Sequence, residues 1–340
     1  MGRIIDGADR VQRRWSVLGY PIAVIYKYFD DQGNYLAATI TYYAFIAIFP
    51  LLLLGSSILG FFLQNDPELA GRILSSALAN FPIVGDQLGR PGGLKGSVPG
   101  VVVGAVAALY GSLGLGQALQ NANNLAWAVP RNRRPNPITL RLKSLLLIVT
   151  TGVAVLAITT VSTLGTDTET FGSKADDAVG WLVRLLTVLV LGTVLTVIFR
   201  FSTSRRHHLV RAAPGAFATA VLWQVLQYLG TIYVDRVIKE THGMNGTFAL
   251  VLGLVGIIYL ASVMGVLGME VNVVLAARLW PRSLASLFTD NTDLTDADLR
   301  AYAGYARSQQ HKSIGSIEVT FRDPDTGEIR LPDDGPGDPG

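Results

Sequence analysis

A carboxylate and an amide near the end of the last apolar segment are the first candidates for chemistry. Glu270 and Asn272 lie in GMEVNVVLAARLW, and Glu270 precedes Arg278 by about 12 Å if the segment is helical. Inside a membrane, such a carboxylate is costly unless it is paired with a basic residue, protonated or in contact with water. A functional ionisable site and a structural Glu–Arg pair both fit these residues, and Asn272 favours a local polar network.

A second apolar segment, LYGSLGLGQALQNANNLAW, carries carboxamides at helical spacing. Successive steps of three or four residues connect Tyr110, Gly114, Gln117, Asn121 and Asn124, and Gln120 lies alongside them. Carboxamides in hydrocarbon must meet each other, water or a ligand. They therefore predict either the wall of a polar cavity or an interhelical network near the cytoplasmic end.

The fifth apolar segment repeats this pattern with Gln224, Gln227, Tyr228, Thr231 and Asp235 on one helical stripe. Asp235 lies near the outer end of its segment, so a pair with Arg184 is geometrically feasible. The alternative is that both charged side chains extend to the outer headgroups.

The first apolar segment, AATITYYAFIAIFPLLLL (37–54), contains the tyrosine pair Tyr42 and Tyr43 and a proline, Pro50. Pro50 removes a backbone donor and is expected to kink the helix about midway. The tyrosines serve either as polar contacts between packed helices or as part of a cavity lined by the kinked helix.

The elements that must position these residues follow from composition. Of 340 residues, 50% are hydrophobic and only 16% are charged, whereas a soluble domain has about 25% charged residues. A membrane-spanning helix needs about 20 mostly apolar residues. The sequence therefore predicts an all-α polytopic membrane protein with six transmembrane helices, at about 36–63, 99–126, 140–164, 178–199, 210–234 and 246–278.

Charge in the connecting segments predicts the orientation. Lys and Arg gather in the N-terminal segment, after the second span and after the fourth span, whereas the loop after the third span is mostly acidic. The positive-inside rule then places both termini in the cytoplasm.

The flanking regions divide the chain into three parts. Residues 1–35 are predicted to be a cytoplasmic N-terminus with an interfacial helix at 17–29, residues 36–279 the transmembrane domain, and residues 280–340 a small cytoplasmic tail. Within the tail, Thr295 and Asp298 resemble a capping box at the start of a short polar helix. IEVTF and EIRL could form a hairpin, and the last residues are expected to be disordered.

Common catalytic signatures are missing from the sequence. It contains no P-loop, HExxH, G-x-S-x-G or EF-hand motif and no cysteine, and its four histidines have no acidic cluster beside them. We therefore expect no enzyme activity, no cofactor, no metal site and no nucleic-acid partner. Membrane lipids are the expected partners, and no oligomeric state follows from the sequence.

Several of these segments resemble the YihY/virulence factor BrkB membrane family. The resemblance rests on LAATITYYAFIAIFPLLLL, ALQNANNLAWAVPRNRRP, APGAFATAVLWQVLQYLGTIYV and GMEVNVVL, and it covers about residues 15–282. Span six departs from the family pattern, with LGLVGIIYL in place of aromatic-rich residues. The resemblance implies a six-helix protein of the bacterial inner membrane, with transport, lipid export or serum resistance as family roles. An old ribonuclease label on the family finds no support in these residues.

Two functions remain open at this point. The first is a transporter, or a translocase for a lipid or small solute, that uses a polar intramembrane cavity. The second is a scaffold or regulator that acts through the cytoplasmic tail without transport.

Overall fold

The computed structural model describes residues 12, 16–62, 98–136, 138–146, 173–205, 208–233, 244–284, 286, 294–322 and 329–330. These residues are almost entirely helical. The α-helices are α2 (Ser16–Asp30), α3 (Gly33–Phe62), α6 (Val98–Ala126), α8 (Ser173–Ser202), α9 (Leu209–Tyr233), α10 (Met244–Ala277) and α11 (Asp296–Ser308). A short 3₁₀ helix, η1 (Arg131–Arg133), follows α6, and residues 138–146 are also helical.

Three segments are long and apolar enough to cross a membrane: Arg184–Ser202, Leu209–Gly230 and Val251–Ala277. They lie in α8, α9 and α10, and they support the predicted membrane class. Helices α3 and α6 have 30 and 29 residues and occupy the first two predicted spans; each is about 45 Å long. The third predicted span is described only as far as residue 146, so the count of six stays a prediction.

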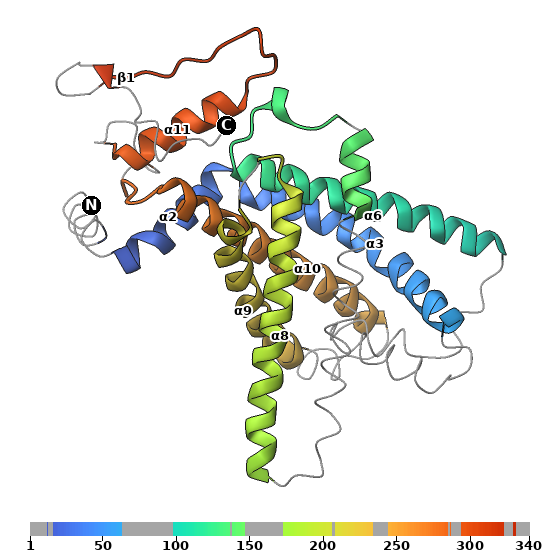
Figure 1. The fold of residues 1–340 in the computed structure, drawn as a ribbon. Helices are drawn as coiled ribbons and strands as arrows, with labels where there is room; N and C mark the ends of the chain where they lie inside the picture. The colour runs from blue at the N-terminus through green and yellow to red at the C-terminus, as the bar shows by residue number, and fades with distance from the viewer. Residues whose placement is uncertain are drawn as a thin grey trace.

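The contacting pairs α3–α6, α8–α9 and α9–α10 run antiparallel, and several helix ends lie together (Figure 1). Asn123 near the end of α6 contacts Ser202 at the end of α8, and Gly215 near the start of α9 contacts Asn272 near the end of α10. Helix α2 packs on α10, and α11 lies beside α2. We call this end of the molecule, where α2 and α11 meet these helix ends, the junction end.

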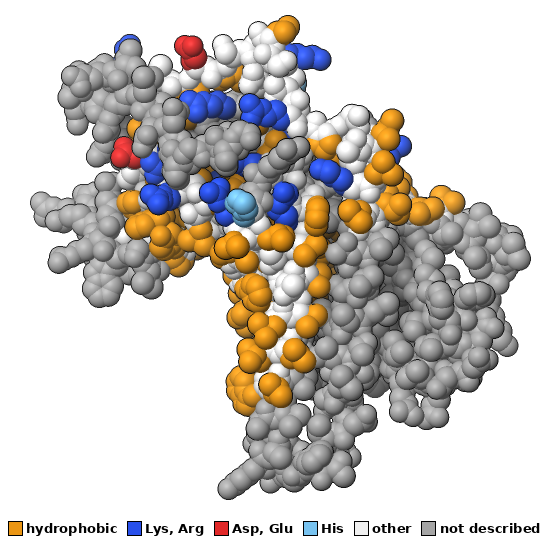
Figure 2. Space-filling model, viewed as in Figure 1, with side chains coloured by type: hydrophobic (Ala, Val, Ile, Leu, Met, Phe, Trp, Pro, Cys, Tyr) orange, Lys and Arg blue, Asp and Glu red, His pale blue; other side chains and the backbone are white. Residues whose placement is uncertain are grey.

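Surface side chains are segregated along the helix axes. Figure 2 shows Lys and Arg side chains in a band at the junction end and hydrophobic side chains along α8 beyond it. The exposed apolar residues of α8 include Trp181, Leu182, Leu185, Leu186 and Leu189. This distribution suits a helix whose sides contact acyl chains and whose end lies among headgroups.

Close backbone contacts hold neighbouring helices together. A Cβ atom at Gly215 would lie 1.8 Å from the carbonyl oxygen of Gly268, so α9 and α10 touch through their backbones. On α6, a Cβ atom at Gly114 would lie 2.1 Å from the ring of Tyr43, which occupies the space beside that glycine. Small residues at these positions therefore set the distances between the helices.

The tail starts as the sequence predicts. The side chain of Thr295 caps the backbone N–H of Asp298, and the Asp298 side chain accepts from the backbone N–H of Thr295, which confirms the capping box of α11. Further on, β1 (Phe321–Arg322) and β2 (Ile329–Arg330) pair antiparallel; β1 lies at the end of the predicted IEVTF segment and β2 lies within EIRL. The final residues, predicted to be disordered, lie outside the described residues.

Candidate functional site

Glu270 meets a basic residue from the N-terminal helix. The Lys27 Nζ atom lies 3.6 Å from Glu270 Oε2 and 2.5 Å from Asp31 Oδ2, and the three side chains are at most 2% exposed. Neither carboxylate oxygen of Glu270 accepts a hydrogen bond from a described residue. Two carboxyl groups therefore share one ammonium group in a place that excludes water.

Asp31 directly follows α2, and its backbone N–H donates to Lys27 O at 2.9 Å, so it lies one helical turn beyond Lys27 on the same side. Burial acts to lower the pKa of Lys27, but the charges of Asp31 and Glu270 outweigh it and raise that pKa above its ordinary value. Burial also raises the pKa of Asp31, although Lys27 acts in the opposite direction. Burial further raises the pKa of Tyr28, next to Lys27, to about 12.

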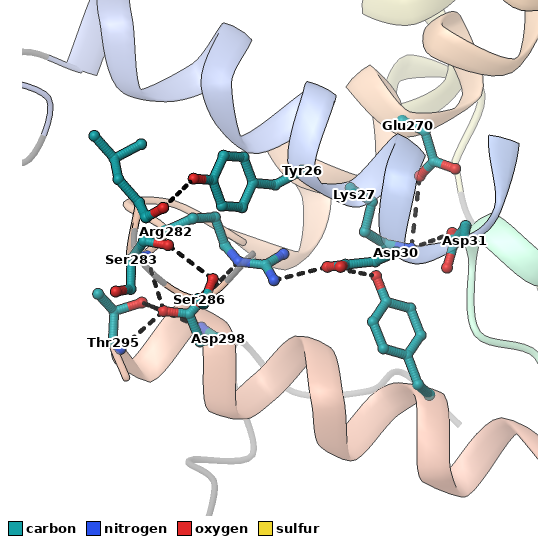
Figure 3. A network of polar contacts seen from close by, with 12 residues as sticks. Tyr26, Lys27, Asp30, Asp31, Glu270, Arg282, Ser283, Ser286, Thr295 and Asp298 are labelled. Carbon is teal, nitrogen blue, oxygen red and sulfur yellow. Dashed lines mark hydrogen bonds and ion pairs between the residues drawn. The ribbon is translucent and has the colours of Figure 1, made fainter. Parts of the chain in front are cut away.

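A second buried cation, Arg282, joins three parts of the junction end (Figure 3). Its Nη2 atom lies 2.8 Å from Asp30 Oδ2 on α2, and its Nε atom lies 2.5 Å from Asp298 Oδ1 on α11. The Tyr305 hydroxyl group donates to Asp30 at 3.5 Å, and the Tyr305 ring lies 4.9 Å from Lys27 Nζ. Helix α11 thus covers both cations.

The buried carboxamides of α6 connect helices. Gln120 Nε2 donates to Ser144 Oγ at 2.9 Å, and Asn123 Nδ2 donates to Phe199 O at 2.6 Å and to Ser202 Oγ at 2.5 Å. The Asn124 side chain, 2% exposed, accepts from the backbone N–H of Ser204 at 2.7 Å. These contacts correspond to the predicted interhelical network. Asn123, which the sequence analysis passed over, belongs to it.

The remaining positions of the predicted α6 stripe do not share this buried environment. Tyr110 is 59% exposed, Asn121 is exposed and Gln117 is half-buried. On α3, Tyr42 is 56% exposed and its ring lies 5.1 Å from that of Tyr43, which in turn lies 6.2 Å from the Tyr110 ring. The residues of the predicted stripe therefore differ in environment: Asn124 is buried in the interhelical network, whereas Tyr110 and Asn121 are exposed.

The other predicted residues are dispersed. Gln224 and Gln227 of α9 are half-buried, and Tyr228 is 69% exposed. The predicted pairing of Asp235 with Arg184 lies outside the described residues, because Asp235 is not among them; the Arg184 guanidinium lies 5.3 Å from the Trp181 ring.

Asn272 and Pro50 also lie within described helices. Asn272 is buried, and its Oδ1 atom accepts from the backbone N–H of Gly215 at 2.7 Å. Gly215 follows Pro214 in α9. Helix α3 continues through Pro50, whose side chain is outside the described residues, and the predicted kink stays a prediction.

The comparisons with known proteins agree with the sequence resemblance. Residues 24–286 match the family model described as Virulence factor BrkB. The chain belongs to this family. No curated protein and no solved structure matches the chain.

The BrkB match covers one part of the junction end and leaves out another. It includes Lys27, Asp31, Glu270 and Arg282, whereas Asp298 and all of α11 lie beyond it. Within the part of the BrkB chain that the structure describes, no group of three or more His, Asp or Glu residues could hold a metal ion.

Sequence reasoning missed the cation partners in this BrkB chain. Lys27 interrupts an apolar segment, and its spacing to Asp31 was a signal that both could face the same neighbour. The carboxylate at Glu270 required a partner, but nothing local indicated that it lies on α2. Arg282 marked the end of the last span without indicating its two carboxylates.

Proposed function

We propose that this chain is a multi-pass protein of the bacterial inner membrane, with both termini in the cytoplasm, that translocates phospholipid between leaflets. The supporting observation is the outward polar surface of α3 and α6. We define the polar track as Thr39, Tyr42, Tyr110, Gln117 and Asn121. All are exposed except Gln117, which is half-buried.

The polar track covers a large part of the membrane's inner half. Tyr110 and Asn121 are separated by about 16 Å along α6, against a hydrocarbon thickness of about 30 Å. The Tyr43 ring lies 5.1 Å from the Tyr42 ring on α3 and 6.2 Å from the Tyr110 ring on α6. At the junction end, Asn121 Oδ1 accepts from Arg134 Nη1 at 3.3 Å, so the track ends at a basic residue.

Polar groups that face acyl chains are costly, and a passing headgroup would offset that cost. Hydroxyl and carboxamide groups can hydrogen-bond phosphate and ester oxygens, and the basic end would attract anionic headgroups. An enclosed cavity for a small solute would need these groups to point inward. Their outward position supports a lipid as substrate.

The topology supports this orientation. Helices α6 and α8 both end at the junction end, as six crossings require if the predicted third span lies between them. The basic segments that follow these two helices then lie on one side, together with α2 and α11. The positive-inside rule assigns that side to the cytoplasm.

Reconstitution tests the proposed function. Purified protein in liposomes with a fluorescent phospholipid should let dithionite bleach probe from the inner leaflet. The double variant Gln117→Leu, Asn121→Leu should slow this at least about tenfold, because hydrogen bonds to a charged headgroup contribute about 1.5–3 kcal/mol. The matched control is Leu109→Ala, an exposed apolar position of the same helix.

Equal liposome incorporation of the three proteins is required for the comparison. Unchanged bleaching in the double variant would refute the polar track as the path. Absence of bleaching in the wild-type protein would instead favour a scaffold role through the tail.

A further inference from the structure

Two buried carboxyl groups compete for one ammonium group at the junction end. Lys27 Nζ lies 2.5 Å from Asp31 Oδ2 and 3.6 Å from Glu270 Oε2, so these two carboxylate oxygens are at most about 6 Å apart. The Asp31 and Glu270 side chains are 1% and 0% exposed. Like charges held this close and away from water do not both ionise readily.

Among the described residues, no second cation forms an ion pair with Glu270. From α2, Asp30 and Tyr28 face the cluster, and from α11 Tyr305 covers Lys27. Arg282 is held by Asp30 and Asp298. From α10, the site receives Glu270 itself, and Tyr259 lies near Tyr28.

The charge count leaves the cluster short of positive charge. Among the described residues at the junction, Lys27 and Arg282 face four carboxyl groups, which are Asp30, Asp31, Asp298 and Glu270. The Glu270 oxygens accept no hydrogen bond from a described residue. A proton on one of the paired acids removes one of these negative charges.

We propose that Asp31 and Glu270 form a proton-binding site that holds one exchangeable proton at neutral pH, with Lys27 as the counterion of the remaining charge. A proton suits the site better than a metal cation, because the Lys27 ammonium would repel a second cation placed between the same carboxylates. Since Asp31 directly follows the last residue of α2 and Glu270 belongs to α10, the proton helps hold these two helices together. Its release leaves two ionised carboxylates that repel each other across the contact.

The proton-binding site does not depend on what the protein translocates, so its test needs no substrate. The full-length protein in lipid nanodiscs is examined by infrared difference spectroscopy during titration from neutral to alkaline pH. The wild-type protein should show the C=O stretch of a protonated carboxyl group, shifted in D₂O and lost at alkaline pH. Glu270→Gln and Asp31→Asn should each abolish it, because the remaining acid then forms a simple ion pair with Lys27.

The matched control is Glu318→Gln, which removes an exposed acid and should leave the band unchanged. If one cluster variant fails to fold, the other decides the result alone. A wild-type spectrum without the band, or a band that persists in a folded Glu270→Gln or Asp31→Asn protein, overturns the proposal. Loss of the band on addition of sodium ions at constant pH would show a metal-cation site and would also overturn it.

Discussion

Replacing Arg282 with methionine should release helix α11 from the junction end. The guanidinium side chain is 0% exposed and lies between Asp30 of α2 and Asp298 of α11. Methionine keeps much of the side-chain volume but removes the charge. Two carboxylates then lose their common partner, and Asp298 is itself fully buried.

The size of the effect follows from burial. Breaking a buried ion pair by removing one partner costs about 3–5 kcal/mol. Asp298 keeps hydrogen bonds from the backbone N–H groups of Ser283 and Thr295, both at 2.9 Å, and Asp30 is 14% exposed. We therefore expect the lower limit, about 3 kcal/mol, which raises the open population of α11 about a hundredfold at 1.4 kcal/mol per tenfold change.

Cysteine labelling measures this opening, because the chain has no native cysteine. A cysteine at Ala301, which is 4% exposed and packed in the core, reports opening of α11. A cysteine at Gln309, which is exposed in the closed state, is the control. Arg282→Met should speed maleimide labelling at position 301 about a hundredfold and leave labelling at position 309 unchanged.

The result that would refute this reasoning is a labelling rate at position 301 that stays within about threefold of the parent rate, a change below about 0.7 kcal/mol. Such a result would mean that apolar packing alone holds α11 in place. A parallel increase at both positions would indicate general unfolding, and thermal denaturation of each variant would detect it.

Three further variants test the packing and the charge cluster by thermal denaturation in nanodiscs. Gly215→Ala should destabilise the protein by about 3 kcal/mol, because its Cβ atom would lie 1.8 Å from Gly268 O. Gly256→Ala is the control and should be nearly neutral, because a Cβ atom there has no neighbour within 4 Å. Similar losses of stability in both variants would contradict the close α9–α10 contact. Asn123→Ala should lower the free energy of unfolding by about 1–3 kcal/mol, because it removes the hydrogen bonds of Asn123 to α8. Asn121→Ala, at an exposed position, should lower it by less than about 0.5 kcal/mol. The reverse order would be inconsistent with the interhelical network. Burial raises the folded-state pKa of Asp31 above its ordinary value of 3.8, so the stabilisation by protonated Asp31 is complete below pH 3.8. This stabilisation is lost as the pH rises toward the folded-state pKa, by at most about 1.4 kcal/mol per pH unit. Asp31→Asn should flatten this dependence of stability on pH, and an equal slope in both proteins would refute the assignment.

Features that depend on local sequence could be predicted well. Apolar length identified the positions of α6 and α10 to within two residues, because a membrane-spanning helix satisfies its own backbone. The start of α11 could be predicted from Thr295 and Asp298 because a capping box involves only neighbouring residues.

Features that depend on neighbouring helices could not be predicted. Gln120 and Asn121 are adjacent, yet about 100° of helix rotation places one in the interhelical network and the other at the surface. Which side points inward depends on α3, α8 and residues 138–146, not on α6 alone. In the same way, Glu270 required a partner, but Lys27 lies far away in sequence and only folding brings them together.

The account's central claim is that the outward polar residues of α3 and α6 contact lipid headgroups. Photocrosslinking in nanodiscs tests it most directly, with a phospholipid that carries a photoreactive group on its headgroup and mass spectrometry to map the adducts. We predict adducts between Tyr110 and Asn121 of α6 and around Tyr42 of α3, reduced in the Gln117→Leu, Asn121→Leu variant. Adducts confined to the basic segments at the junction end, with none along α6, would contradict the claim.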